Sequence, residues 1–259
     1  MENLVYNRGL YRTGPAMLNP VARTMPSFVF YLKLFLIVLR SSRRAKRSMY
    51  DTADWAKSSL AVMRALESVG VKIEISGIDA FRDLETPCVF LANHMSSLET
   101  FVLPAIIAQY RDVTFVVKQS LVDYPVFRHV MRSRDPITVG RTNPRDDLKA
   151  VLEGGVERLK AGRSLVIFPQ TTRMEEFDPK GFNTIGIKLA KRAEAPVVPI
   201  ALRTGAWGNG KHLKDFGKID PSRHVHFAFG RPIRIKGRGI EEHNEVIAFI
   251  SGKIKEWDV

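Results

Sequence analysis

The sequence of 259 residues predicts an α/β fold in which helices flank a mixed, partly parallel central sheet. Two observations support this prediction. Short apolar runs typical of buried strands alternate along the chain with segments whose apolar residues recur at helical spacing. Such alternation is typical of sheets that contain parallel strands. We expect an N-terminal arm with helices over residues 1–69 and an α/β domain over residues 70–259.

Each element of this fold is predicted by a local pattern. Residues 1–24 contain scattered arginines and no clear period, so we expect an irregular or partly ordered arm. Apolar residues at helical spacing from Trp55 to Val69 predict a helix that stops at Gly70, because glycine commonly ends helices. Strands are predicted at residues 71–75, 87–92, 113–117, 137–139, 164–168, 197–202, 225–229 and 233–235. Helices are predicted at 96–109, 146–159, 184–193 and 241–257, and a charged loop at 76–86.

The charge of the chain indicates an anionic partner. The formal net charge is +13 and the isoelectric point is about 10.0, which suits nucleic acid, a membrane surface or a phosphorylated substrate. We find no nucleic-acid-binding module, so no nucleic-acid partner is predicted. The single cysteine, Cys88, excludes an intramolecular disulfide, and its apolar neighbours predict a core position.

An apolar run at residues 28–39 is followed at once by a cluster of basic residues. The run is shorter than the 20 or so residues of a spanning helix, and no secretory signal is evident. One interpretation is a helix in the interface of an anionic membrane; the other is a buried helix with a solvated basic end. We favour the first, because it explains the apolar run and the charge together. The predicted interface residues are Phe28, Phe30, Tyr31, Phe35, Arg40, Arg43, Arg44, Lys46 and Arg47.

Charged or titratable residues follow four of the predicted strands. His94, Lys118, Arg141 and Arg173 each come directly after an apolar strand or the turn that ends it. In α/β sheets, ligand crevices form at the carboxyl ends of strands. One base and three cations at a common edge therefore predict a site for a phosphate-bearing ligand.

His94 is followed five residues later by Glu99. The two side chains would point apart on one helix, but they can meet if His94 lies in the turn and Glu99 in the first helical turn. The carboxylate would then fix the imidazole tautomer and leave the other ring nitrogen as a general base. Alternatively, Ser96 and Glu99 form a capping box, in which the glutamate only satisfies backbone donors. The residues alone leave both interpretations open.

Four sequence blocks occur in a recognisable order. They are Asn93-His94 with Glu99, Ile137-Thr138-Val139-Gly140-Arg141, Phe168-Pro169-Gln170-Thr171-Thr172-Arg173, and Val198-Pro199-Ile200. Their order and spacing resemble the glycerolipid acyltransferase family, typified by 1-acyl-glycerol-3-phosphate acyltransferase. The resemblance covers roughly residues 70–205. Glutamate stands where the family usually has aspartate, and Gln170-Thr171 replaces its Glu-Gly pair in the block expected to hold the acyl acceptor.

This resemblance implies a direct acyl transfer from acyl-coenzyme A or acyl carrier protein to a lysophospholipid or related glycerolipid. His94 would be the general base and Glu99 would stabilise the imidazolium. Lys118, Arg141 and Arg173 would bind phosphate, and Gln170, Thr171 and Thr172 would form the acceptor block. A thiolate leaves easily, so no metal or cofactor is expected. The protein would be peripheral or monotopic on the cytoplasmic face of a membrane.

The sequence also allows other functions to be considered. A covalent route through Cys88 or Ser96 lacks a nucleophile elbow. His224 and His226 could share one face of a strand, yet no further metal-ligand cluster is apparent in the sequence. The main alternative is a non-catalytic lipid-binding or scaffold protein that retains the acyltransferase fold.

Overall fold

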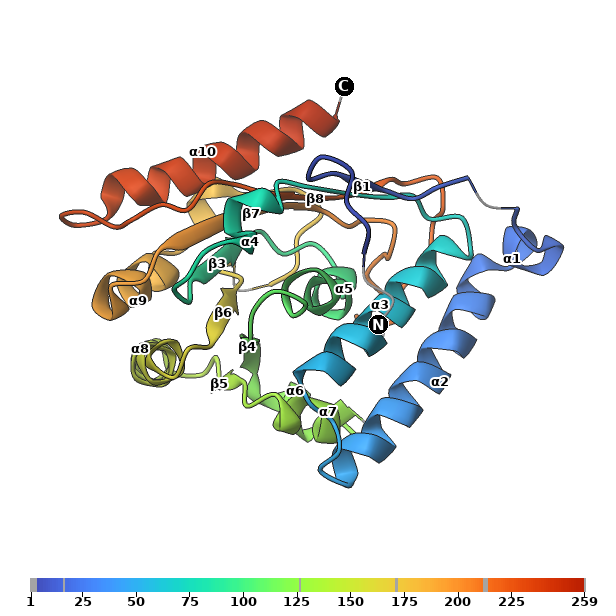
Figure 1. Cartoon of the computed structure of the whole chain (residues 1–259), viewed down its shortest axis with the longest axis horizontal. Helices are drawn as coiled ribbons and strands as arrows, with labels where there is room; N and C mark the ends of the chain where they lie inside the picture. Colours follow the sequence, from blue (N-terminus) through green and yellow to red (C-terminus); the bar gives the residue numbers. More distant parts are fainter. Residues whose placement is uncertain (1–3, 16, 126, 171, 212–213, 259) are drawn as a thin grey trace.

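The computed structural model describes residues 4–15, 17–125, 127–170, 172–211 and 214–258. In these residues an eight-stranded sheet has the order β1-β2-β8-β7-β3-β6-β4-β5 (Figure 1). Most neighbours are parallel, whereas β1 and β8 run antiparallel to β2 and β7 respectively. The strands are β1 Tyr11–Arg12, β2 Ile73–Ser76, β3 Val89–Ala92, β4 Val113–Lys118, β5 Ile137–Val139, β6 Ser164–Ile167, β7 Val197–Arg203 and β8 Val225–Phe229. The predicted mixed, partly parallel sheet is confirmed.

Helices cover both faces of this sheet (Figure 1). The helices are α1 Pro20–Thr24, α2 Pro26–Lys46, α3 Thr52–Glu67, α4 Asp79–Arg82, α5 Leu98–Ile107, α6 Gln119–Asp123, α7 Phe127–Ser133, α8 Pro144–Lys160, α9 Ile185–Ala193 and α10 Ile240–Trp257, with a 3₁₀ turn at Pro179–Gly181. On one face α8, α9 and α10 enclose an apolar core. On the other, α3 and α5 pack together, and α2 lies outside α3.

The central strand β3 positions the turn that contains His94. All four of its residues are buried, because β6 and β7 flank it and helices cover both faces. Parallel central strands buried on both sides are continuous apolar runs, which is why the sequence pattern located this strand well. The chain leaves the sheet directly after Ala92, at the edge where the parallel strands all end.

The sequence prediction was wrong at residues 233–235, which form no strand. Only Ile233 pairs, exchanging two backbone hydrogen bonds with Val197 at 2.7 and 2.8 Å. Val197 begins β7 and lies beyond the last β8 pair, Ile200 with Phe229, so Ile233 can pair with it there. The expected loop at 76–86 contains the short helix α4, and α6 and α7 were not predicted.

The N-terminal arm contributes to the same sheet. Tyr11 and Arg12 pair with Ile75 and Glu74, so β1 extends the sheet at the edge formed by β2. The division of the chain at residue 69 stays a prediction.

Helix α2 has apolar residues on the face that meets the protein and also on the face that meets solvent. Phe30, Leu34 and Val38 are buried, whereas Phe28 and Phe35 are 59% and 58% exposed. Phe30 packs against Trp207, and the half-buried Tyr31 donates a hydrogen bond to the Gly217 carbonyl. Placing Phe30 in a membrane interface was therefore wrong, since its side chain is fully buried, whereas the interface role of Tyr31 stays a prediction.

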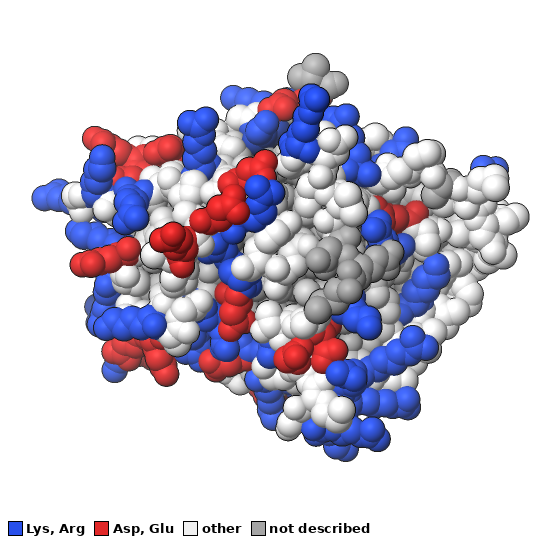
Figure 2. All heavy atoms as spheres, in the orientation of Figure 1, with Lys and Arg blue, Asp and Glu red and all other residues white. Residues whose placement is uncertain are grey.

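The basic residues after the apolar run lie at the C-terminal end of α2. Arg40, Arg43, Arg44, Lys46 and Arg47 are exposed there, and Arg44 pairs with Asp54 at 2.7 Å. Figure 2 shows Lys and Arg gathered over this end of the helix and uncharged surface beside it. None of the described helices is both long enough and apolar enough to cross a bilayer.

Candidate active site

Asn93 fixes the point where the chain leaves β3. Its side-chain amide donates to the Leu202 carbonyl at 2.9 Å, and its Oδ1 accepts the Leu202 N–H at 2.8 Å. This pair continues the β3–β7 ladder by one side chain after the strand ends. His94 follows immediately, in a turn whose start is thereby anchored to the neighbouring strand.

The His94 ring contacts Glu99 as the orienting interpretation requires. His94 Nδ1 lies 2.9 Å from Glu99 Oε1, and Glu99 is in the first turn of α5. The ring also stacks on Phe168, with 4.4 Å between centroids and 23° between planes. A carboxylate at Nδ1 favours the tautomer with a proton on that atom, which leaves Nε2 with a free lone pair. The His94 side chain is 12% exposed.

Glu99 is fully buried and surrounded by donors. Its carboxylate accepts backbone N–H groups from Met95 at 2.6 Å and Ser96 at 3.0 Å, and the Thr204 hydroxyl donates to it at 2.6 Å. Burial would raise the pKa of the Glu99 carboxyl, but hydrogen bonds and the charge of His94 outweigh burial and hold that pKa below its ordinary value. Glu99 is therefore an anion beside His94 at neutral pH.

The two interpretations of Glu99 describe one carboxylate with two sets of contacts. Its bond to the Ser96 N–H resembles the return half of a capping box, although the N-cap residue of α5 is Ser97. The Ser96 hydroxyl has two acceptors within reach of its single proton, Glu99 Oε2 at 3.1 Å and the Thr204 carbonyl at 3.0 Å, and it also accepts the Leu98 N–H at 3.1 Å. These contacts fix the orientation of the Glu99 carboxylate, so that Oε1 is aimed at His94 Nδ1.

Gln170 supports the same turn from β6. It is 2% exposed, and its Oε1 accepts the His94 backbone N–H at 2.9 Å. Its Nε2 is buried with no hydrogen-bond partner among the described residues. Thr172 is exposed, and Thr171 lies outside the described residues. Gln170 thus contacts the histidine's backbone.

The three predicted cations share the edge of the sheet but differ in place. Arg173 lines the same cavity as His94 and forms an ion pair with Asp215, while also donating to the Lys214 carbonyl at 3.1 Å. Lys118 ends β4, two strands from β3, and Arg141 follows β5, three strands away. At about 4.8 Å per strand these two lie roughly 10 and 14 Å along the edge.

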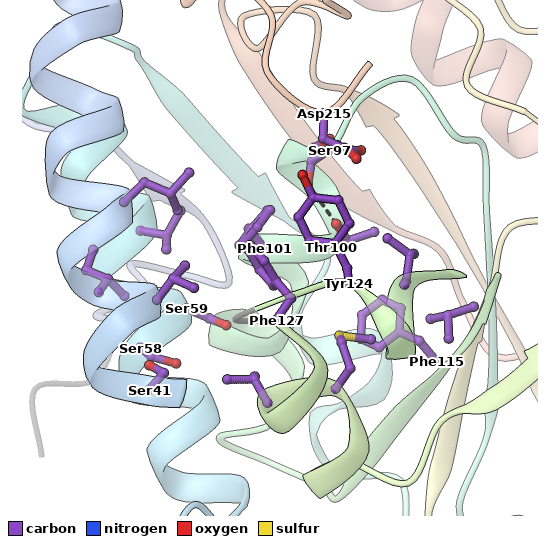
Figure 3. A pocket seen from close by; sticks show the side chains of 18 of the residues that line it. Ser41, Ser58, Ser59, Ser97, Thr100, Phe101, Phe115, Tyr124, Phe127 and Asp215 are labelled. Carbon is purple, nitrogen blue, oxygen red and sulfur yellow. Dashed lines mark hydrogen bonds between the residues drawn. The ribbon is translucent and has the colours of Figure 1, made fainter. Parts of the chain in front are cut away.

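His94 faces a cavity that extends between α2, α3 and α5, with α6 and α7 closing one side. Figure 3 shows Ser97 and Asp215 at one end and Ser41, Ser58 and Ser59 at the other. The wall between the ends is mostly apolar and includes Val62, Phe101, Phe115, Tyr124, Phe127 and Met131. Such a lining suits a hydrocarbon chain.

Other candidate residues lack these surroundings. Cys88 is fully buried, and burial raises the pKa of its thiol to about 11, so it is not a thiolate nucleophile at neutral pH. His226 stacks on Trp257, and its Nδ1 lies 3.9 Å from Glu74. Within the described ranges no three His, Cys, Asp or Glu side chains are grouped to hold a metal ion.

Sequence reasoning missed three contributors to this site. Thr204 reaches Glu99 across 105 positions, and Asp215 reaches Arg173 across 42. Phe168 was quoted as part of a motif but not expected to stack on the His94 ring. No local pattern signals these contacts, because each joins segments that are far apart in the sequence.

A buried acid–histidine pair at the carboxyl edge of a mixed sheet, open to an apolar cavity, defines a site suited to acyl-group chemistry on lipids. The family comparison agrees with this class: the Acyltransferase family model matches residues 72–203, and the chain belongs to that family. The chain is similar to a 1-acyl-sn-glycerol-3-phosphate acyltransferase of Pseudomonas aeruginosa, with 30% identity over 161 residues. A chloroplastic Brassica napus protein of the same activity name is 29% identical over 140 residues.

These matches cover parts of the proteins. They span 62% of this chain and 60% of the Pseudomonas relative, and 54% of this chain and 38% of the Brassica relative. Among solved structures, the 1-acyl-sn-glycerophosphate (LPA) acyltransferase PlsC of Thermotoga maritima aligns with a TM-score of 0.68. That alignment covers 92% of this chain and 97% of PlsC at 18% identity, which establishes the shared fold.

Proposed function

We propose that this protein transfers a fatty acyl group from an acyl thioester to a hydroxyl group of a lysophospholipid. The observation that carries the proposal is the His94–Glu99 pair, 2.9 Å apart, at one end of an apolar cavity. The names of the relatives support 1-acyl-glycerol-3-phosphate as the acceptor class. The thioester is acyl-coenzyme A or acyl carrier protein.

The reaction is a direct transfer. His94 Nε2 removes the proton from the acceptor hydroxyl as its oxygen bonds to the thioester carbonyl carbon. The carbon–sulfur bond then breaks, and the imidazolium returns the proton to the departing thiolate. Glu99 stabilises the imidazolium between these steps, and its buried anionic state suits that role.

In this proposal the cavity binds the acyl chain and the cations bind the phosphate of the acceptor. The apolar wall between α3 and α5 would hold the acyl chain, with the thioester carbonyl beside His94. Arg173 is the cation at the cavity, so the acceptor phosphate would compete with Asp215 for its guanidinium. Lys118 and Arg141 lie further along the edge, where they would attract the anionic head group.

The membrane contact would be made by the outer face of α2. Phe28, Leu32 and Phe35 are more than half exposed on one side of the helix, and the basic end follows them. An exposed apolar stripe next to cations suits the interface of an anionic membrane, on its cytoplasmic face in this proposal.

The decisive experiment supplies purified protein with palmitoyl-coenzyme A or palmitoyl acyl carrier protein and a panel of lysophospholipids. We expect transfer to 1-acyl-glycerol-3-phosphate and a loss of at least about a hundredfold in kcat for His94→Ala. Transfer from no pair of substrates, or equal transfer by His94→Ala, would contradict the proposal and favour a non-catalytic lipid-binding protein.

The membrane contact has its own test. A Phe28→Ser/Phe35→Ser variant should bind anionic vesicles more weakly than the wild type, and added salt should weaken both. Ile240→Ser is the matched control, because Ile240 is 61% exposed at the start of α10. Equal vesicle binding by the double variant and the control would reject α2 as the contact surface.

A further inference from the structure

The far end of the apolar cavity is lined by hydroxyl groups. Helix α2 presents Leu34, Ile37, Val38 and Ser41 to the cavity, and helix α3 presents Trp55, Ser58, Ser59 and Val62. Both sets follow the spacing of one helical face, i, i+3, i+4 and i+7. Ser41 is the last of the four lining residues on α2, and Ser58 and Ser59 are the middle two on α3. Figure 3 shows these three serines together at one end of the cavity. With Tyr50, which also lines the cavity, they form the distal hydroxyl cluster.

Ser41, Tyr50 and Ser59 are buried and Ser58 is partly exposed, and the hydroxyl groups of the cluster are only partly paired with one another. Ser58 Oγ lies 2.5 Å from the Tyr50 hydroxyl and donates to the Trp55 carbonyl at 3.1 Å. Ser59 is 4% exposed and lines the cavity, and none of the side-chain hydrogen bonds of the described residues involves its hydroxyl.

An unsubstituted alkyl chain would be poorly matched to this end of the cavity. A chain that fills the cavity removes water from the hydroxyls it touches, and a methyl end offers them no hydrogen bond in return. A buried hydroxyl left unpaired is destabilising, whereas a hydroxyl on the ligand can both donate to and accept from the cluster. Alanine or valine at these helix positions would instead have continued the apolar wall.

We propose that the distal hydroxyl cluster selects an acyl thioester whose chain carries a hydroxyl group in its distal part. The inference rests on the proposed function, because it assigns the acyl chain to this cavity with its carbonyl at His94. Ser59 supplies the unpaired donor and acceptor, and the Ser58–Tyr50 pair supplies a second contact. The cluster is thus a specificity determinant for the acyl donor.

The test is a competition between acyl donors. Wild-type protein is given equal amounts of palmitoyl-coenzyme A and the same donor hydroxylated either at mid-chain or on its last carbon, with 1-acyl-glycerol-3-phosphate as acceptor. We expect one hydroxylated donor to be preferred in kcat/KM by about tenfold, a ratio that one buried hydrogen bond supports. Equal use, or preference for palmitoyl, overturns the inference.

A triple variant, Ser41→Ala/Ser58→Ala/Ser59→Ala, makes the end of the cavity apolar. It should reverse the preference toward palmitoyl. Ser42→Ala is the matched control, since Ser42 is a buried serine of the same helix that does not line the cavity, and it should keep the wild-type ratio. A wild-type ratio in the triple variant overturns the inference, and the wild-type competition decides alone if the triple variant does not fold.

Failure of the inference and failure of the proposed function are distinguishable. Palmitoyl transfer without preference leaves the proposed function intact. If no donor is used, displacement of a fluorescent fatty acid by palmitic acid and its hydroxylated forms still measures the cavity's preference. Tighter binding of a hydroxylated form by about tenfold supports the inference, and equal binding overturns it.

Discussion

Glu99 and Glu67 are both buried carboxylates, 0% and 8% exposed, but their surroundings differ in kind. Glu67, at the end of α3, accepts hydrogen bonds from the Tyr11 and Thr13 hydroxyls and pairs with Arg64 at 2.8 Å. It ties the N-terminal arm to α3, next to a cation that is charged at every physiological pH.

Among the described residues, Glu99 pairs with no arginine or lysine and instead has neutral donors and one titratable partner, His94. His94 lines the apolar cavity. Burial of a carboxylate therefore does not by itself mark an active site. The mark is a titratable neighbour whose other side is open to a ligand, because only then can the carboxylate assist a proton transfer.

Neutralising Glu99 should have the largest effect on activity. Glu99→Gln should lower kcat by about a hundredfold or more, because a neutral amide cannot stabilise the imidazolium. Glutamine still fits a capping box, so the variant should remain folded, as a melting curve would check. Unchanged turnover in a folded variant would reduce Glu99 to a structural residue.

The matched change at the other site should act on stability alone. Glu67→Gln weakens charge-assisted hydrogen bonds to Arg64, Tyr11 and Thr13, and we expect about 1–2 kcal/mol less free energy of unfolding. Denaturant titration measures that loss, and kcat should stay within about twofold of the wild type. A large fall in kcat would show that the two carboxylates are not different in kind.

Thr204→Val probes how tightly Glu99 must be held. The change removes the hydroxyl that donates to Glu99 at 2.6 Å and preserves the shape of the side chain. We expect kcat to fall by about threefold to tenfold, and stability by about 1 kcal/mol. Full activity would show that the backbone donors suffice to orient the carboxylate.

The pH dependence of stability gives the smallest signal. The pKa of Glu99 is below its ordinary value of 4.5 in the folded protein, so its ionised form contributes stability that is complete above that value. The contribution is lost as pH falls through the folded pKa. The stability difference between wild type and Glu99→Gln should therefore shrink when unfolding is measured below pH 4.5, and a constant difference would contradict the assignment.

The sequence predicted the parts of this site that depend on local order. His94 and Glu99 lie five residues apart, where a strand gives way to a helix, and the apolar run before them located β3. His94, Lys118, Arg141 and Arg173 lie along one edge of the sheet, as predicted, because parallel strands place their carboxyl ends at the same edge.

What the sequence missed depends on contacts between distant segments. The Thr204 hydroxyl reaches Glu99 only because β7 ends beside β3. An apolar run likewise does not say which helical face meets the core, so Phe28 and Phe30 looked equivalent although the first is exposed and the second buried. Helices α6 and α7 are short, at five and seven residues, and offer too few turns for a periodic pattern.

The most direct measurement of the central claim is a double-mutant cycle on kcat with His94→Ala, Glu99→Gln and the double variant. If Glu99 acts through His94, the two changes cannot be additive, because removing the imidazole leaves nothing for the carboxylate to stabilise. We expect Glu99→Gln to lower kcat about a hundredfold in the wild type and less than about threefold in the His94→Ala background. An equal loss in both backgrounds would contradict it.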